Sequence, residues 1–405
     1  MDGQAINLQD NKESVIKSGV KRLTLTDFRN YASLRLNAEL CPIVITGENG
    51  SGKTNILEAI SFLTPGRGLR SAKLADIKRI SPSLVANDYI PAPNGWAVSA
   101  VIANNFNEIE LGTGIETATK EVDDDTRFYE RRIVKINGQK TSSQADLGRY
   151  ISAIWLTPQM DRLFKGGSQP RRSFLDRLVY AFDLEHAKRT ANFEHLYKEW
   201  FQLIKSGKTD GHWLSSIEQE MAAIGVAIAA ARREQTARLN TFIENEPDDV
   251  FPNVKLALEG TIEQMLDERP AIEVEDYYLT LLQKQRQNVL YSEYIDGINR
   301  TDFKVFYKKK RMPAELCSTG EQKSLLVSII LAQTKCQTLD KGFSPVLLLD
   351  EVAAHLDDAK REALLSKIKD LHVQAWVTST TAELFTSMRD DAQFFEIKNN
   401  HVFER

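Results

Sequence analysis

The chain has 405 residues, of which 42% are hydrophobic and 27% are charged; this balance predicts two or three packed units and excludes a largely disordered chain. The formal net charge of −4 excludes a chain that is basic overall, so contacts with nucleic acid must come from local patches. The three cysteines form no metal-ligand spacing and fit a reducing cytoplasm. The longest apolar stretch, near Met221–Ala231, is too short to cross a bilayer, so we expect a soluble cytoplasmic protein with no membrane segment.

The N-terminal part begins with a segment of no clear pattern, residues 1–20, which we expect to be a flexible tail. Apolar residues alternate at 23–28 and again at 34–36, which predicts two strands joined by a turn at Arg29–Asn30. Residues 95–137 alternate in the same way and indicate an antiparallel β-region.

A glycine-rich loop follows the short apolar strand at residues 42–46 and precedes an amphipathic helix. Its residues, Gly47–Thr54, match the pattern G-x-x-x-x-G-K-[ST] of phosphate-binding loops. Glycines let backbone amides turn toward phosphate oxygens, and the helix presents its positive end to the same anion. A chance glycine-rich loop is the alternative, but the strand and the helix on either side argue against it. We expect contacts to ATP from Gly47, Glu48, Asn49, Gly50, Ser51, Gly52, Lys53, Thr54 and Asn55.

Two side chains of this loop have predicted roles of their own. The ammonium group of Lys53 is expected to contact the β- and γ-phosphates of ATP, which makes it a catalytic candidate. The Thr54 hydroxyl is a candidate ligand of Mg²⁺.

The middle of the chain has a helical pattern from Arg171 to about Asn245. Apolar residues recur at helical spacing, which predicts a packed helix face. Residues 274–291 predict another helix, and a strand-like stretch follows at 295–309. The residues of the packed face are Ile217, Met221, Ile224 and Ile228.

The C-terminal part alternates helices and strands, and its strand at Val346–Leu349 ends in two acids. An acid pair at the carboxyl end of a strand suits a nucleotide site. Asp350 is expected to hold Mg²⁺, and Glu351 to activate the attacking water as a general base. The alternative is a buried strand followed by a helix-capping acid.

A second anion-binding end is predicted at Ser318–Gln322, where a hydroxyl, backbone amides and the start of an apolar helix coincide. Ser318 and Gly320 are the candidate contacts. An ordinary helix N-cap is the alternative for this segment taken alone.

Together these residues resemble the ABC-type ATPase heads of chromosome-maintenance proteins, in which the phosphate loop lies at one end of the chain and the signature and acid strand at the other. Ser318–Gln322 is similar to the LSGGQ signature of that family. It departs from the pattern at Cys317 for Leu, Thr319 for the first Gly and Glu321 for Gln.

The resemblance extends to three further positions. Ala353–Asp357 resembles the D-loop, with Asp357 at the acidic position. Thr378 occupies the switch position where ABC transporters carry His, and it is a further catalytic candidate. Gln159 is the candidate Q-loop residue.

Within these heads the chain resembles the RecF family. It has no long heptad segment for a coiled-coil arm and no central CxxC for a zinc hook. The segments that carry the resemblance are Leu25–Tyr31, Gly47–Asn55, Gly66–Arg70, Val134–Gly138 and Lys165–Asp176.

The resemblance implies an α/β fold, an ABC-type ATPase head (a P-loop NTPase) assembled from N- and C-terminal parts, with an inserted and mostly helical second lobe. We expect the flexible tail at 1–20, the N-terminal part of the head with a β-rich region at 21–170, the helical lobe at 171–295, and the C-terminal part of the head at 296–405.

The resemblance also implies a function. It predicts a weak DNA-dependent ATPase that dimerises on ATP, binds DNA at gaps or junctions, and helps RecA to load together with RecO and RecR. That role belongs to DNA replication, recombinational repair and the SOS response to DNA damage. The alternative is a non-hydrolysing scaffold whose DNA-binding surface is gated by nucleotide.

Clusters of basic residues are the candidates for DNA contact. Each cluster has an alternative interpretation as a solvated charged surface. The candidates are Arg67, Arg70, Lys73, Lys78 and Arg79 in the N-terminal part, and Lys308, Lys309, Lys310 and Arg311 in the C-terminal part.

Overall fold

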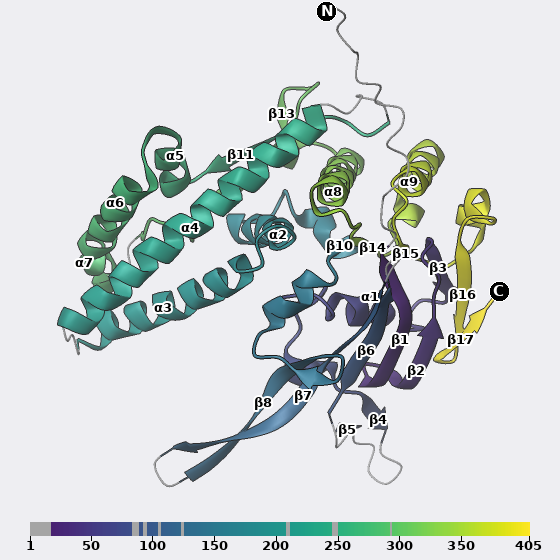
Figure 1. Ribbon diagram of the computed structural model, residues 1–405. Coiled ribbons are helices and arrows are strands. Elements are labelled where there is room, and N and C mark those ends of the chain that lie inside the picture. The colour runs from purple at the N-terminus through teal and green to yellow at the C-terminus, as the bar shows by residue number, and fades with distance from the viewer. Residues whose placement is uncertain are drawn as a thin grey trace, which may run out of the picture. The chain divides into compact units, whose positions relative to one another are not determined.

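The computed structural model describes residues 18–82, 89–91, 95–103, 107–122, 125–207, 211–244, 250–291 and 294–405. The predicted flexible tail therefore lies outside the described residues, except for residues 18–20. The chain divides into two compact units (Figure 1). Unit 1 combines Met1–Thr157 with Thr334–Arg405, and unit 2 is Pro158–Gln333.

The first sheet of unit 1 contains strands from both ends of the chain. Its order is β10-β14-β15-β3-β16-β17, and all neighbours are parallel except β16 and β17. Because parallel strands end at the same edge, residues that follow β3, β14 and β15 meet there. The strands are β10 (Ala153–Leu156), β14 (Val346–Leu349), β15 (Ala375–Ser379), β3 (Ile43–Gly47), β16 (Gln393–Lys398) and β17 (His401–Glu404).

The second sheet of unit 1 is antiparallel, in the order β2-β1-β6-β7-β8-β9. Phe28 pairs with Tyr31, which confirms the predicted turn at Arg29–Asn30. In Figure 1, β7 and β8 continue as a long two-stranded ribbon. The strands are β2 (Tyr31–Asn37), β1 (Gly19–Phe28), β6 (Ala97–Ala103), β7 (Glu108–Val122), β8 (Asp125–Ile136) and β9 (Gln139–Lys140), and a separate pair is formed by β4 (Ile80–Pro82) and β5 (Tyr89–Pro91).

The helix after the glycine-rich loop is α1 (Lys53–Ser61), and it buries the predicted apolar face. Ile56 and Ile60 of α1, and Leu63 just beyond it, have no exposed surface, as expected for the apolar face of an amphipathic helix. The other helices of unit 1 are α9 (Asp358–Asp370), the end of α8 (Thr319–Lys341), and the short 3-10 helices η1 (Leu74–Ile77), η2 (Gln144–Arg149), η5 (Ala353–His355) and η6 (Glu383–Met388).

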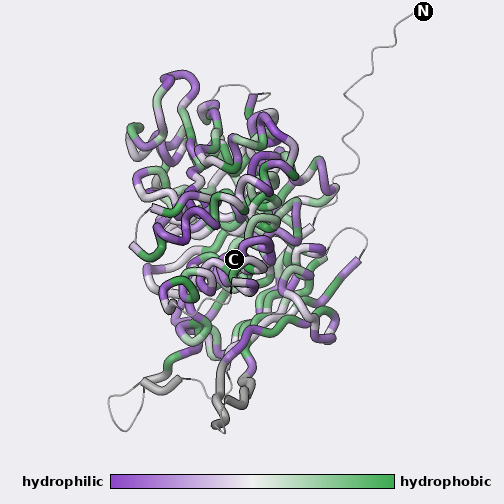
Figure 2. Tube along the Cα trace, turned by 90° about the vertical axis from the view of Figure 1, so that its left-hand side faces the viewer, coloured by the Kyte–Doolittle hydropathy of each residue, from purple (hydrophilic) through white to green (hydrophobic). Residues whose placement is uncertain are grey.

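Unit 2 is mostly helical and has its own core. Trp200, Met221 and Tyr278 are among the most deeply buried members of one apolar cluster. Short hydrophobic and hydrophilic stretches alternate along the chain (Figure 2), as expected for helices that bury one face. The elements are α2 (Ser168–Tyr180), α3 (His186–Ser206), α4 (Gly211–Glu244), α5 (Thr261–Glu268), α6 (Ala271–Lys284), α7 (Arg286–Tyr291), η3 (Pro158–Arg162), η4 (Ala314–Leu316) and the start of α8, with the sheet β11 (Val254–Glu259), β12 (Asp302–Tyr307) and β13 (Met312–Pro313).

Unit 2 is larger than the lobe expected at 171–295. It also includes residues 158–170 and 296–333. The pairing of β12 with β11 explains part of this difference, because it joins the later residues to a strand inside the expected lobe.

Among the described residues, α4 is the one helix that is long and apolar enough to cross a membrane. Half of its most apolar window is buried inside the protein. Its apolar residues, including Met221 and Ile228, lie in the core of unit 2. Core packing therefore accounts for the apolar composition of α4.

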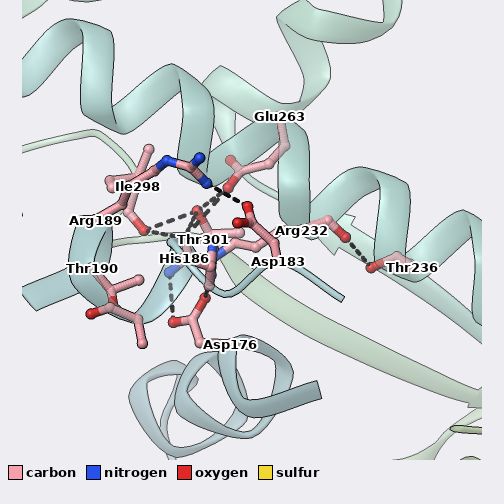
Figure 3. A network of polar contacts seen from close by, with 11 residues as sticks. Asp176, Asp183, His186, Arg189, Thr190, Arg232, Thr236, Glu263, Ile298 and Thr301 are labelled. Atoms are coloured by element: carbon pink, nitrogen blue, oxygen red, sulfur yellow. Dashed lines mark hydrogen bonds and ion pairs between the residues drawn. The ribbon is translucent and has the colours of Figure 1, made fainter. Parts of the chain in front are cut away.

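A second, polar core lies beside the apolar one in unit 2 (Figure 3). Arg232 of α4 forms a bidentate ion pair with Asp176 of α2, with N–O distances of 2.8 and 2.9 Å. Asp176 also contacts the ring of His186 at 2.9 Å. Glu263 of α5 lies 3.6 Å from Arg232 and accepts a hydrogen bond from Thr301. These buried charges connect three helices of the lobe.

Candidate functional site

The phosphate loop joins β3 to α1 in unit 1. The side chain of Lys53 is buried, and its ammonium group donates hydrogen bonds to the carbonyl oxygens of Gly47 and Glu48 at 2.7 and 2.9 Å. Burial lowers the pKa of Lys53, while the negative charges of Glu351 and Asp350 act in the opposite direction. The lysine charge therefore lies within the loop, in the field of both acidic residues.

Gly52 shows why this loop requires glycine. Its φ angle is 103°, in the left-handed region that side chains disfavour. A Cβ atom at this position would lie 2.5 Å from Nδ2 of Asn30 and 2.7 Å from Oη of Tyr31. The β1–β2 turn therefore packs directly on the loop backbone, while the tip of the loop, residues 48–50, is exposed.

Asp350 connects the loop to the acid strand. The hydroxyl of Thr54 donates to Oδ1 of Asp350 at 2.9 Å, and the hydroxyl of Thr378 donates to the same oxygen at 2.8 Å. The structure thus brings together the start of α1 and the ends of β14 and β15. The two predicted Mg²⁺ ligands, Thr54 and Asp350, lie in contact.

Glu351 has an unusual backbone at the end of the acid strand. Its φ angle is 53°, which is uncommon for a residue other than glycine and is found most often where function requires a fixed geometry. The amide of Glu351 donates to the hydroxyl oxygen of Thr378 at 2.9 Å. Thr378, the third catalytic candidate at this edge, therefore holds both acidic residues.

A polar network behind the loop was missed by sequence reasoning. Glu58 of α1 is fully buried between Arg29 and Arg70, with contacts of 2.6 to 2.9 Å. Asn55 accepts a hydrogen bond from Arg70 and donates one to Asn30. The sequence contained one signal of this network. Glu58 falls on the buried side of a helix, and Arg70 follows a few residues beyond that helix, as expected for a buried ion pair.

Curated relatives match nearly the whole chain. "DNA replication and repair protein RecF" of Allorhizobium ampelinum is 41% identical over 388 residues, which are 95% of this chain and 99% of the relative. The same protein of Rhizobium rhizogenes is 40% identical over 385 residues, with 95% and 98% covered. The family model described as "RecF/RecN/SMC N terminal domain" matches residues 19–402. The chain belongs to the RecF family.

Solved structures of the same fold confirm the predicted ABC-type ATPase head. The recombination mediator protein RecF, in a structure described as "RecF-ATPrS in RecFOR pathway", superposes with a TM-score of 0.80 at 20% identity and covers 96% of this chain and 99% of its own. The head of Smc, bound to the C-winged helix domain of ScpA, gives a TM-score of 0.52 at 15% identity, with 95% and 96% covered.

The signature segment of this RecF-family chain lies in unit 2, at the start of α8. Ser318, Thr319 and Gly320 are all exposed. The amide and hydroxyl of Ser318 both donate to Oε2 of Glu321 at 2.9 Å, and the amide of Glu321 lies 3.3 Å from the Ser318 hydroxyl oxygen. These reciprocal contacts form a capping box, so the helix-cap interpretation describes the local geometry correctly.

The two remaining nucleotide candidates lie on separate units. Gln159 is exposed on η3 of unit 2. Asp357 of unit 1 is the N-cap of α9, where its carboxylate accepts a hydrogen bond from the amide of Lys360 at 2.9 Å. That hydrogen bond lowers the pKa of Asp357. Both side chains are accessible to a ligand or a second chain.

The candidate DNA contacts differ in their exposure and in whether their charges are paired with acidic residues. Arg70 is bound to Glu58 and Asn55. Arg67 and Lys73 are exposed and line one cleft of unit 1, next to Phe62. In unit 2 the run Lys308–Arg311 is exposed at the turn between β12 and β13. Within this run Lys308 lies 3.5 Å from the exposed Glu244, and Lys310 pairs with Glu321. Exposed cations remain the better candidates, because none of them is held by a fully buried acid as Arg70 is by Glu58. Lys78 and Arg79 form ion pairs with Glu130 and Asp27.

Proposed function

We propose that this chain is an ATP-dependent DNA-binding protein of recombinational repair, which hydrolyses ATP slowly and dimerises when ATP is bound. The names of its relatives, which describe DNA replication and repair, support the biological role. The observation that carries the chemistry is the hydrogen-bonded group Thr54, Asp350, Thr378 and Glu351 beside Lys53. It unites a phosphate loop with a pair of acids from the other end of the chain.

The nucleotide would lie on the phosphate loop. The amides of residues 47–55 and the positive end of α1 would hold its phosphates. Lys53 would exchange its bonds to the loop carbonyls for bonds to the β- and γ-phosphates. In that position its buried charge acts more strongly than it would in water.

Thr54 and Asp350 fit a magnesium ion. Their oxygens are 2.9 Å apart, and a hydroxyl with a carboxylate is the donor set that Mg²⁺ prefers beside nucleotide phosphates. When bound, the ion would neutralise charge on the phosphates. Glu351 would take a proton from the attacking water, and Thr378 would keep its backbone in position.

The second half-site would come from another copy of the chain. Ser318 and Gly320 are exposed at the N-terminal end of α8, where a helix binds anions. A γ-phosphate held by Lys53 of one subunit would contact Ser318 of the other. Gln159 and Asp357 are proposed to line the same shared site. ATP would thus hold a two-fold dimer together.

DNA would bind to the exposed cations, and these include Arg67, Lys73 and the run Lys308–Arg311. The solved RecF structure belongs to the RecFOR pathway, which supports RecO and RecR as partners in loading RecA. A cytoplasmic location follows from that role.

The four-part division of the chain that the sequence predicts, with its helical lobe at 171–295, is also part of the proposal.

Two substitutions test the ATP site. Lys53→Ala should lower ATP affinity by about ten- to a hundredfold, because a charge-assisted hydrogen bond to phosphate is lost. Glu351→Gln should keep ATP affinity but lower turnover by about a hundredfold or more. Affinity is measured with a fluorescent ATP analogue and turnover by phosphate release. Parental turnover in Glu351→Gln would remove Glu351 from the base role. Binding of ATP by the parent without any release of phosphate would favour the alternative, a scaffold that only binds nucleotide.

A mixing experiment tests the shared site. Ser318→Arg should bind ATP as a monomer and fail to dimerise, because the bulky cation blocks the partner's phosphate. Lys53→Ala should also fail. A mixture of the two variants should recover dimers, since one of the two shared sites is then intact. Sedimentation with and without ATP measures this. Dimers formed by Ser318→Arg alone would refute the shared-site model.

A further inference from the structure

The signature segment already contains an anion. Oε2 of Glu321 accepts hydrogen bonds from both the amide and the hydroxyl of Ser318, each at 2.9 Å. These are the two donors that a phosphate oxygen would use at the start of a helix. The carboxylate of Glu321 therefore occupies the position in which an incoming phosphate would be bound.

A lysine from outside the helix holds this carboxylate. Lys310, in the turn between β12 and β13, forms an ion pair with Oε1 of Glu321. Its ammonium group also lies 5.7 Å from the centre of the Tyr307 ring. The hydrogen bonds from Lys310 and from Ser318 lower the pKa of Glu321 to about 2. The carboxylate is therefore negatively charged at every pH at which the protein would function.

The surroundings of this contact are open. A Cβ atom built on Gly320 would meet nothing within 4 Å, so the absence of a side chain at this position has no packing reason within the unit. Ser318 and Gly320 are themselves exposed, so a second chain can reach the start of this helix.

We propose that Glu321 is a built-in competitor for the signature: its carboxylate occupies the donors of Ser318 until the γ-phosphate carried by a second copy of the chain displaces it, and Lys310 then holds the displaced carboxylate. This inference rests on the proposed shared site. It adds a positioning role for Lys310, which the sequence places among the DNA-binding candidates. It also makes Glu321 the residue that sets the ATP concentration needed for dimerisation.

Electrostatics gives the sign of each effect. A phosphate that approaches Ser318 meets the negative charge of Glu321, and repulsion between like charges opposes its binding. Lys310 lowers that repulsion through Glu321, because its ion pair holds the displaced carboxylate away from Ser318. Removing the acid should favour the dimer, and removing the lysine should disfavour it. If Lys310 acts through Glu321, it should have no effect once the acid is gone.

The variants are Glu321→Gln, Lys310→Met and the double variant. Glutamine can still accept the amide hydrogen bond of the capping box, so α8 should keep its N-terminus. Lys255→Met is the control, because it removes the same charge from an exposed position on the neighbouring strand β11. For each protein, the ATP concentration that gives half-maximal dimerisation is measured by sedimentation, without DNA.

Glu321→Gln should lower this ATP concentration by roughly three- to tenfold, and Lys310→Met should raise it by a similar factor, as expected for coupled neighbours. The double variant should match Glu321→Gln, and the control should match the parent. A Lys310→Met effect that persists in the double variant would overturn the proposal. The same ATP concentration for half-maximal dimerisation in the parent, the two single variants and the double variant would overturn it too. If Ser318→Arg still dimerises, the shared-site model itself fails; if it does not, these outcomes concern only Glu321.

Discussion

At the scale of single residues, Thr378 has the most specific role that the geometry supports. It has no exposed surface, and its hydroxyl both donates to Asp350 and accepts from the amide of Glu351. One hydroxyl provides one donor, so Thr378 cannot also donate to a phosphate while these contacts persist. We therefore expect Thr378 to act through the two acids, as a positioning residue.

Thr378→Val should lower kcat by about tenfold or more, because small errors in placing a catalytic group are costly. Affinity for ATP without magnesium should change little. Thr378→Ser keeps the hydroxyl and should restore most of the turnover. Phosphate release at saturating ATP separates the two variants. If Thr378→Ser turns over ATP as slowly as Thr378→Val, the loss of the methyl group explains the effect, and the positioning role of the hydroxyl is wrong.

The sequence predicted the residues that the phosphate-loop pattern and the acid strand place at one edge of a sheet. It did not predict the packing of Asn30 on the loop, or the hydrogen bond from Asn30 to Asn400 at 2.6 Å. Such contacts join positions that are far apart in sequence and belong to no local pattern. Periodicity cannot reveal them, since it describes only which face of an element is buried.

At the scale of elements, the buried ion pairs of unit 2 (Figure 3) fix how α2, α4 and α5 meet. Burial alone would raise the pKa of Asp176, but the charge of Arg232 and the contact with His186 outweigh it and hold that pKa below its ordinary value of 3.8. Asp302, paired with Arg171, has a lowered pKa for a similar balance of causes.

Arg232→Met should destabilise unit 2 by about 3–5 kcal/mol, because it leaves the Asp176 carboxylate buried and uncompensated. Arg233→Met is the matched control: Arg233, the neighbour of Arg232 on α4, pairs with Asp267, whose side chain is 65% exposed, so a change below about 1 kcal/mol is expected. Urea unfolding followed by the fluorescence of Trp200 and the other tryptophans measures both. Equal losses would show that the buried pair adds nothing.

The same pairs predict a dependence on pH. A carboxylate whose pKa is lower in the folded state stabilises the fold above its unfolded-state pKa, and this contribution is lost as the pH falls below that value. For Asp176 and Asp302 the loss should begin near pH 4 and continue downward. Urea titrations of the parent and of Arg232→Met between pH 7 and pH 3 test this. The stability of the variant should change less with pH.

Elements with strong periodicity or a continuous apolar run were predicted well, including the short strands β3 and β14, whereas β11 was not. The face of α4 and the helix α1 follow from apolar spacing. The strand β11 has only two fully buried residues, Val254 and Leu256, which is too weak a pattern to assign. Its pairing with β12, which moves later residues into unit 2, is a long-range contact.

At the scale of the whole molecule, the net charge of −4 requires DNA binding to be local. Replacing Lys308, Lys309 and Arg311 with alanine should weaken duplex binding about equally for every sequence, because phosphate contacts carry no base information. Lys310 is kept, since its loss would affect the signature. The log–log salt slope should fall by roughly one unit per lost contact.

Titration of labelled duplex at several salt concentrations, with ATP present, measures the effect. The corresponding change at Arg67 and Lys73 tests the cleft of unit 1 in the same assay. An unchanged slope after a triple or double substitution would mean that the cluster only solvates the surface, and that cluster would be removed from the proposed interface.

The strand order of the parallel sheet has a consequence for biosynthesis. β3 carries the phosphate loop, yet both of its neighbours, β15 and β16, follow unit 2 in the chain and are translated after it. While the ribosome is still making unit 2, β3 has no neighbouring strands to pair with, and Asp350 and Glu351 have not yet been made. A nascent or prematurely released chain would therefore have no assembled ATP site. Only a molecule whose translation has passed β16 could bind ATP at this loop, so products truncated before β15 would have no part in the nucleotide cycle as ATP binders.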